Sequence, residues 1–70
     1  MKTIKINTEF ITLGQFLKFA GIIDAGATAK IFLQTQKTTV NGESEQRRGR
    51  KLYPGDEITL GSDKFRIEKP

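Results

Sequence analysis

The spacing of apolar residues is helical in one part of the chain and alternating in the rest. Residues 1–6 alternate polar and apolar side chains, which predicts a short strand with two isoleucines on one face. Thr12 and Gln15 then match the capping-box pair that is typical of a helix start. We expect a helix over Leu13 to Ala20 whose apolar face is made of Leu13, Phe16, Leu17 and Ala20.

A second helix is predicted from Asp24, a favourable N-cap residue, to about Thr35. Its apolar face is made of Ala25, Ala29, Phe32 and Leu33. The two alanines allow another backbone to approach closely. Because only residues 21–24 connect the helices, we expect them to form a tightly packed pair.

Hairpins are predicted in the second half of the chain. Residues 37–40 read as a strand, Asn41-Gly42 is a strong hairpin-turn signal, and the return begins at Glu43. Residues 47–52 are expected to form an extended segment or a loop, and residues 53–56 a turn. The chain is then expected to close with two short strands joined by a turn, Glu57 to Leu60 and Lys64 to Ile67.

Together these elements predict an α+β fold in which two short packed helices lie against a small, mostly antiparallel β-sheet. At 70 residues the chain is expected to be a single domain, residues 1–70. It shows no internal repeat, linker or low-complexity tract.

The composition argues against catalysis and against a metal centre. The chain has no cysteine and no histidine, so the usual zinc ligand sets cannot be assembled. Ser44 and Ser62 lie in no recognised nucleophile motif. Asp56 lies in a Gly-Asp turn, where we expect its carboxylate to accept hydrogen bonds from nearby backbone amides. We therefore expect no enzymatic activity, no cofactor and no small-molecule substrate.

The sequence predicts no membrane segment and no secretory signal. The longest nearly apolar run, residues 16–23, is interrupted by Lys18 and is too short to cross a bilayer. We expect a cytoplasmic protein that acts as a monomer.

Positive charge is concentrated in one short segment. Lysine and arginine outnumber aspartate and glutamate by 12 to 8, and four of the cations surround Gly49, namely Arg47, Arg48, Arg50 and Lys51. The planar guanidinium of arginine suits phosphate oxygens, and Gly49 lets the backbone approach closely or adopt a positive φ. Glu43 and Glu45 are expected to be partial internal partners. The pattern favours a polyanionic ligand.

Three lysines could extend this surface. If the hairpin lies beside the second helix, one continuous patch is expected to include Lys18, Lys30 and Lys37. Single-strand binders usually display aromatic rings, but here we expect all five phenylalanines in the core and Tyr53 as the one exposed ring. This favours structured RNA recognised by charge and shape over unstacked bases.

The order of these elements resembles the S-four RNA-binding domain, the module named after a ribosomal small-subunit protein. The resemblance covers about residues 12–60 and is carried by the two helices, the Val40-Asn41-Gly42 hairpin, the basic segment and Pro54-Gly55-Asp56-Glu57-Ile58. Residues 42–52 together with Gly55-Asp56 look like the stand-alone YaaA/YbcJ-type members.

The resemblance implies an αL-type RNA-binding motif that contacts ribosomal or transfer RNA through the second helix and the adjoining hairpin. By position it indicates Lys30, Lys37 and residues 47–51. This chain has Ala25-Gly26 where the family commonly has Ser-Arg, and Gln36 where it commonly has glycine, which shifts weight to the basic segment.

We therefore expect non-enzymatic binding of structured RNA, either ribosomal RNA or a ribosome-assembly particle. The alternative is a protein-interaction adaptor whose basic segment docks an acidic partner protein. A weaker third possibility is a sequence-tolerant DNA binder.

Overall fold

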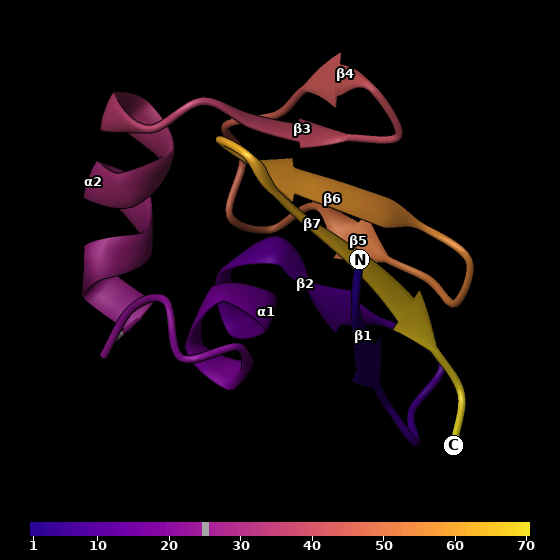
Figure 1. Cartoon of the computed structure of the whole chain (residues 1–70). Helices are drawn as coiled ribbons and strands as arrows, with labels where there is room; N and C mark the ends of the chain where they lie inside the picture. Colours follow the sequence, from indigo (N-terminus) through magenta and orange to yellow (C-terminus); the bar gives the residue numbers. More distant parts are fainter. Residues whose placement is uncertain (25) are drawn as a thin grey trace.

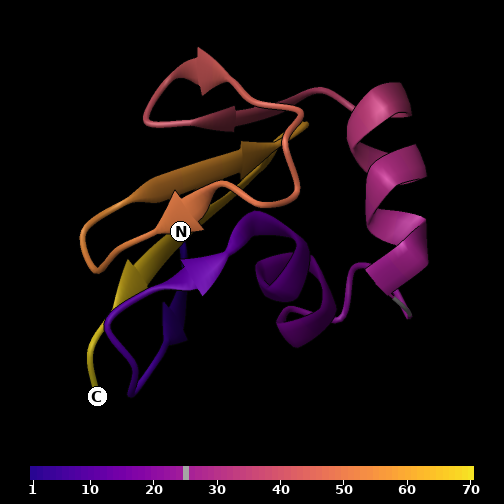
Figure 2. The same cartoon turned by 180° about the vertical axis from the view of Figure 1, so that it is seen from behind.

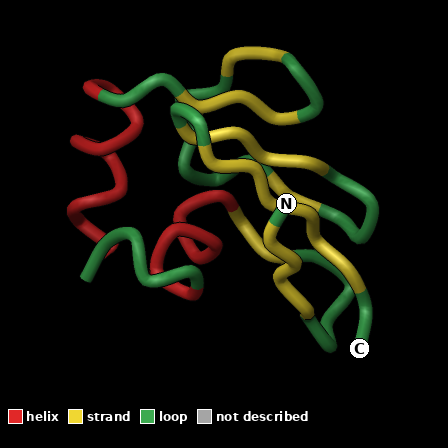
Figure 3. Tube along the Cα trace, viewed as in Figure 1, coloured by secondary structure: helices red, strands yellow, loops and turns green. Residues whose placement is uncertain are grey.

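The computed structural model describes residues 1–24 and 26–70, in which two helices lie to one side of the strands (Figures 1 and 3). The elements in chain order are β1 (Lys2–Lys5), β2 (Ile11–Thr12), α1 (Leu13–Phe19), α2 (Gly26–Thr35), β3 (Thr38–Val40), β4 (Glu43–Ser44), β5 (Lys51–Leu52), β6 (Glu57–Leu60) and β7 (Asp63–Glu68).

The strands form one five-stranded sheet in the order β1-β7-β6-β3-β4 and a separate two-stranded sheet of β2 and β5. Each neighbouring pair is antiparallel except β1 and β7, which are parallel with Ile4 opposite Ile67. The predicted α+β class with a mostly antiparallel sheet is confirmed. The parallel pair and the second sheet were not predicted, because alternation within a strand does not identify its partner.

The first helix begins as its capping box predicts. The amide of Gln15 donates to Thr12 Oγ1 over 3.3 Å, and the amide of Thr12 donates to Gln15 Oε1 over 3.0 Å. The helix ends at Phe19, and Gly21 follows with a φ of 76°. Helix α2 spans Gly26–Thr35, so its predicted end at about Thr35 is confirmed. The prediction made for Ala25 lies outside the described residues, and the predicted capping by Asp24 stays a prediction.

The apolar faces of the helices and the sheet meet in one core. The largest fully buried side chains come from both helices and from four strands: Leu13, Phe16, Leu17, Leu33, Val40, Leu52, Ile58 and Ile67. Each contributes roughly 1.5–3 kcal/mol relative to an exposed side chain. Phe16 and Phe65 pack edge to face with ring centroids 5.3 Å apart.

The expectation that every phenylalanine is buried is wrong. Phe16 and Phe65 are in the core and Phe10 and Phe32 are half-buried, but Phe19 is 64% exposed. At about 100° per residue, Phe19 falls well away from the arc of α1 that faces the core, whereas residues 13, 16 and 17 fall within it. The expected exposure of Tyr53, at 43%, is confirmed.

Two turns at one end of the sheet are fastened to each other. Asn41 and Gly42 have φ values of 52° and 86°, as the hairpin between β3 and β4 requires. The Asn41 side chain donates to Asp56 Oδ1 over 3.1 Å and accepts from the amide of Glu57 over 2.9 Å. Asp56 Oδ2 accepts from the amide of Tyr53, as predicted. These contacts fix both ends of residues 43–53.

Candidate nucleic-acid interface

Residues 47–51, the basic segment, connect β4 to β5 and cross the start of α1 (Figure 2). The amide of Leu13 donates to the carbonyl of Arg50 over 2.8 Å, and the amide of Gly14 donates to the carbonyl of Arg48 over 2.9 Å. The first amides of a helix have no acceptor within the helix, so the segment supplies the acceptors that α1 needs. Its backbone is therefore held in a defined position.

Gly14 lies in close contact with the basic segment. A Cβ atom added there would lie 3.4 Å from both the Cβ and the carbonyl oxygen of Arg48, and 3.7 Å from the Cβ of Ala29 on α2. The glycine thus stands where α1, α2 and the basic segment converge. The sequence analysis missed this role, since a glycine in the first turn of a helix has no distinctive spacing to reveal it.

Glu45 organises two of the four cations. Its side chain is only 6% exposed and accepts from Arg47 Nε over 3.0 Å, from Arg47 Nη2 over 3.1 Å and from Arg50 Nη1 over 2.8 Å. The Arg47 amide also donates to it. The hydrogen bonds from Arg47, with those from Arg50, hold the pKa of Glu45 at about 2, against the opposing effect of burial. Glu45 in turn raises the pKa of Arg47.

The predicted pairing with acidic neighbours is thus confirmed for Glu45 but not for Glu43. Glu43 is exposed and forms no ion pair within the described residues. Over the same part of the chain, Arg48 and Lys51 are exposed and form no ion pair either. Arg47 keeps 77% of its side chain exposed despite its contact with Glu45.

The basic segment borders an open hollow of about 440 Å³ lined by Arg47, Gly49, Arg50, Lys51 and Tyr53. Gly49 does not adopt a positive φ, but a Cβ atom added there would meet nothing within 4 Å. Three predicted site cations therefore surround one concave surface that is accessible to a ligand.

The three predicted lysines lie outside the hollow of the basic segment, at different places on the surface. Lys37 lines a groove of about 220 Å³ that also includes Glu45 and Gln46, directly before Arg47. Lys30 is exposed on α2, next to Ala29 at the convergence with Gly14. Lys18 instead lines a hollow of about 610 Å³ together with Phe10 and Phe19.

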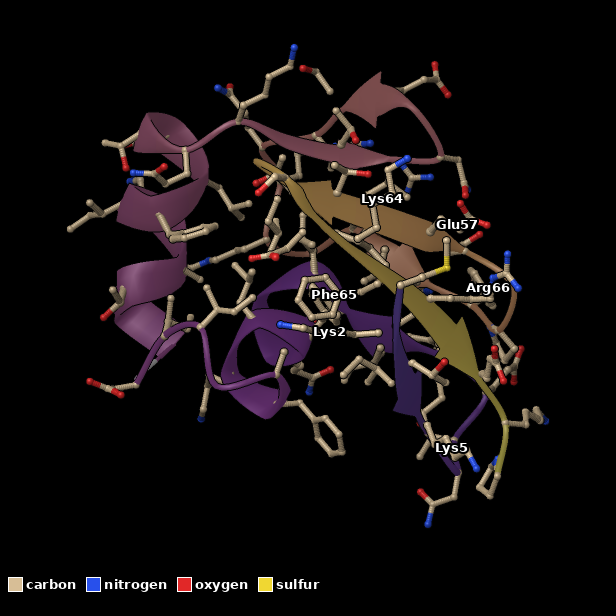
Figure 4. The ribbon with its side chains drawn as sticks, in the orientation of Figure 1. Lys2, Lys5, Glu57, Lys64, Phe65 and Arg66 are labelled. Atoms are coloured by element: carbon tan, nitrogen blue, oxygen red, sulfur yellow. The ribbon has the colours of Figure 1, made fainter. Side chains whose placement is uncertain are left out.

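A second group of cations lies on β7 and its neighbour β1, with β7 in front of β6 and β5 in Figure 1 and behind them in Figure 2. Figure 4 labels Lys2 and Lys5 on β1 and Lys64 and Arg66 on β7. Arg66 pairs with Glu57 at 2.6 Å, and Lys2 Nζ lies 5.6 Å from the centre of the Phe65 ring. Lys64 and Lys69, the latter directly after β7, are exposed and do not line the hollow of the basic segment, so they offer matched controls for charge removal.

Neither described helix is long and apolar enough to span a membrane. Within residues 1–24 and 26–70, no three acidic side chains are grouped in a way that could hold a metal ion.

The order of strands and helices, together with the basic segment that is hydrogen-bonded to the start of the first helix, defines a small α+β domain with a clustered positive charge. The chain belongs to the S4-domain family, whose model matches residues 4–68. It is also 51% identical over 65 residues to the "Probable ribosome maturation protein RlbA" of Bacillus subtilis (strain 168), covering 91% of this chain and 92% of that protein. The S-four resemblance seen in the sequence is confirmed.

Proposed function

We propose that this protein binds structured RNA of the ribosome, or of an assembling ribosomal particle, without catalysing a reaction. It does so in the cytoplasm as a single copy. The proposed contacts are made by the basic segment and by Lys18, Lys30 and Lys37. The observation that carries the proposal is the fixed position of residues 47–51, whose carbonyls accept from the first amides of α1 and whose arginines are oriented by Glu45.

The charge balance of the segment supports a phosphate ligand. The segment carries four cations, and only two of them pair with the one buried carboxylate, so the positive charge is only partly neutralised inside the protein. Arg48 and Lys51 are free to make charge-assisted hydrogen bonds to phosphate oxygens, which are stronger than neutral ones. Membership of the S4-domain family and the name of the Bacillus subtilis relative support RNA, and ribosomal RNA in particular, as the polyanion.

Co-sedimentation with ribosomal particles tests this proposal. We expect the wild-type protein to travel with particles in a sucrose gradient and to be released by ribonuclease. The double variant Arg48→Gln, Lys51→Gln should lose about tenfold or more in affinity for ribosomal RNA, since two charge-assisted contacts are removed.

The matched control is Lys64→Gln, Lys69→Gln, which removes the same charge from β7 and the residue after it and should bind nearly as tightly as the wild type. Retention of partners after ribonuclease treatment would contradict the proposal and favour an adaptor that docks an acidic protein. Equal affinity for duplex DNA and folded RNA at matched salt would favour a sequence-tolerant DNA binder.

A further inference from the structure

Phe10 and Phe19 both line the open hollow of about 610 Å³ beside the start of α1. The remaining lining residues are Thr8, Ile11, Gln15 and Lys18. Its volume lies within the roughly 300–1,000 Å³ typical of sites for small organic groups. The hollow combines aromatic rings, a cation and side-chain amide donors, and the sequence analysis assigned no function to it.

Phe19 is the most exposed aromatic residue of the chain, although its neighbours Phe16 and Leu17 are completely buried. Phe19 also borders a second hollow, of about 310 Å³, shared with Thr8 and Ile11. An accessible aromatic ring in a hollow is the arrangement by which proteins stack the unpaired bases of single-stranded nucleic acid.

The hollow of about 610 Å³ that Phe10 and Phe19 line, the aromatic hollow, lies next to the basic segment. Phe10 packs against Tyr53 with ring centroids 5.9 Å apart, and Lys51 Nζ lies 4.9 Å from the centre of the Phe10 ring. Lys51 and Tyr53 in turn line the hollow of the basic segment. A strand whose phosphates contact residues 47–51 can therefore place its next nucleotides in the hollow that Phe10 and Phe19 line.

The polar groups of the hollow suit a nucleotide. Lys18 supplies a positive charge at its edge for a flanking phosphate. Gln15 accepts from the Thr12 amide through Oε1, which fixes its carboxamide and leaves the two hydrogens of Nε2 available to an acceptor on a base edge.

We propose that an unpaired base of the bound RNA stacks on the exposed ring of Phe19 in this hollow, with Lys18 and Lys51 contacting the neighbouring phosphates. This inference rests on the proposed RNA binding and adds that the ligand is a structured RNA with a single-stranded extension, not a helix alone.

Two hairpin RNAs test the inference. Both have the same stem and the same number of phosphates, and one carries a short 3′ adenosine extension where the other carries abasic nucleotides. We expect the wild-type protein to bind the adenosine hairpin roughly tenfold more tightly than the abasic one, because stacking on a ring contributes to affinity independently of charge. Phe19→Leu should reduce the ratio to about one while leaving the abasic hairpin's affinity unchanged.

Phe19→Tyr keeps a ring and should preserve the ratio. Ile31→Ala, which alters an exposed apolar side chain on the other helix, α2, should not change the ratio either. Because Phe19 is exposed, these variants are expected to fold as the wild type does. Equal, salt-sensitive affinity for both hairpins would overturn the inference while the proposed RNA binding stands, as would a ratio that survives Phe19→Leu. No binding of either hairpin would overturn both.

Discussion

At the scale of single residues, Glu45 determines how two arginines of the basic segment are presented. It is one of two buried polar residues among those described, and it receives three side-chain hydrogen bonds from Arg47 and Arg50. A carboxylate in this position neutralises part of the positive charge that a ligand could contact. In return it restricts two long side chains to one arrangement before RNA arrives.

The low pKa of Glu45 makes a prediction about pH. Its pKa falls from 4.5 to about 2 on folding, so its contribution to stability is fully present above pH 4.5 and is lost as the pH falls towards 2. We expect Glu45→Gln to lower the free energy of unfolding at pH 7 by about 1–2 kcal/mol, a value reduced for the solvent screening of the exposed Arg47.

Thermal unfolding followed by circular dichroism between pH 2 and pH 7 measures this contribution. The difference in midpoint between the wild type and Glu45→Gln should be several degrees at neutral pH and should shrink below pH 4.5. A difference that stays constant over this range would show that the charge of Glu45 is not what holds the two arginines.

Sequence reasoning could identify the four cations of the basic segment but could not rank them. In the sequence they are equivalent neighbours around Gly49. In the structure Arg47 and Arg50 contact a buried carboxylate, whereas Arg48 and Lys51 do not. This distinction depends on which side chains converge on Glu45, and spacing along the chain does not determine that.

At the scale of elements, the contact between the basic segment and α1 determines where the backbone of the basic segment lies. Gly14 lies at this contact: a Cβ atom there would already touch the Cβ and carbonyl oxygen of Arg48 at 3.4 Å, which leaves little room for a branched side chain. The helix and the segment therefore constrain each other through backbone hydrogen bonds as well as through close packing.

Gly14→Val tests this contact between α1 and the basic segment. We expect a loss of about 1–3 kcal/mol in the free energy of unfolding, since the added methyl groups collide with Arg48 and Ala29. RNA affinity should fall as well, because the basic segment must move away from α1. Urea unfolding and RNA titration of the same preparation measure both effects.

Gly49→Ala is the matched control, because an added Cβ at Gly49 meets nothing within 4 Å and its φ is not positive. Its stability should lie within about 0.5 kcal/mol of the wild type. If Gly14→Val were equally harmless, the basic segment would not depend on close contact with α1.

The elements that were predicted well are those with local causes. The capping box of α1, the Asn41-Gly42 hairpin and the Asp56 turn each depend on contacts within a few residues. The parallel pairing of β1 with β7 and the pairing of β2 with β5 join segments distant in sequence. Two-residue strands carry too little alternation to be recognised before their partners are known.

At the scale of the whole molecule, positively charged side chains occupy two surfaces, and one of these surfaces also carries exposed aromatic rings beside the cations. One surface carries Arg66 paired with Glu57, while the other carries the basic segment together with Phe10, Phe19 and Tyr53. The sequence analysis predicted the basic segment and the family. It did not predict the aromatic hollow, because Phe19 was assigned to the core as an apolar residue, without regard to its angular position around α1.

The salt dependence of RNA affinity tests the central claim most directly. If about four to six phosphates are contacted, log affinity should fall with log salt concentration with a slope of roughly −3 to −5. In Arg48→Gln, Lys51→Gln the slope should be shallower by roughly 1.5–2, and in Lys64→Gln, Lys69→Gln it should match the wild type. A flat salt response, or the same change of slope in both double variants, would contradict RNA binding through the basic segment.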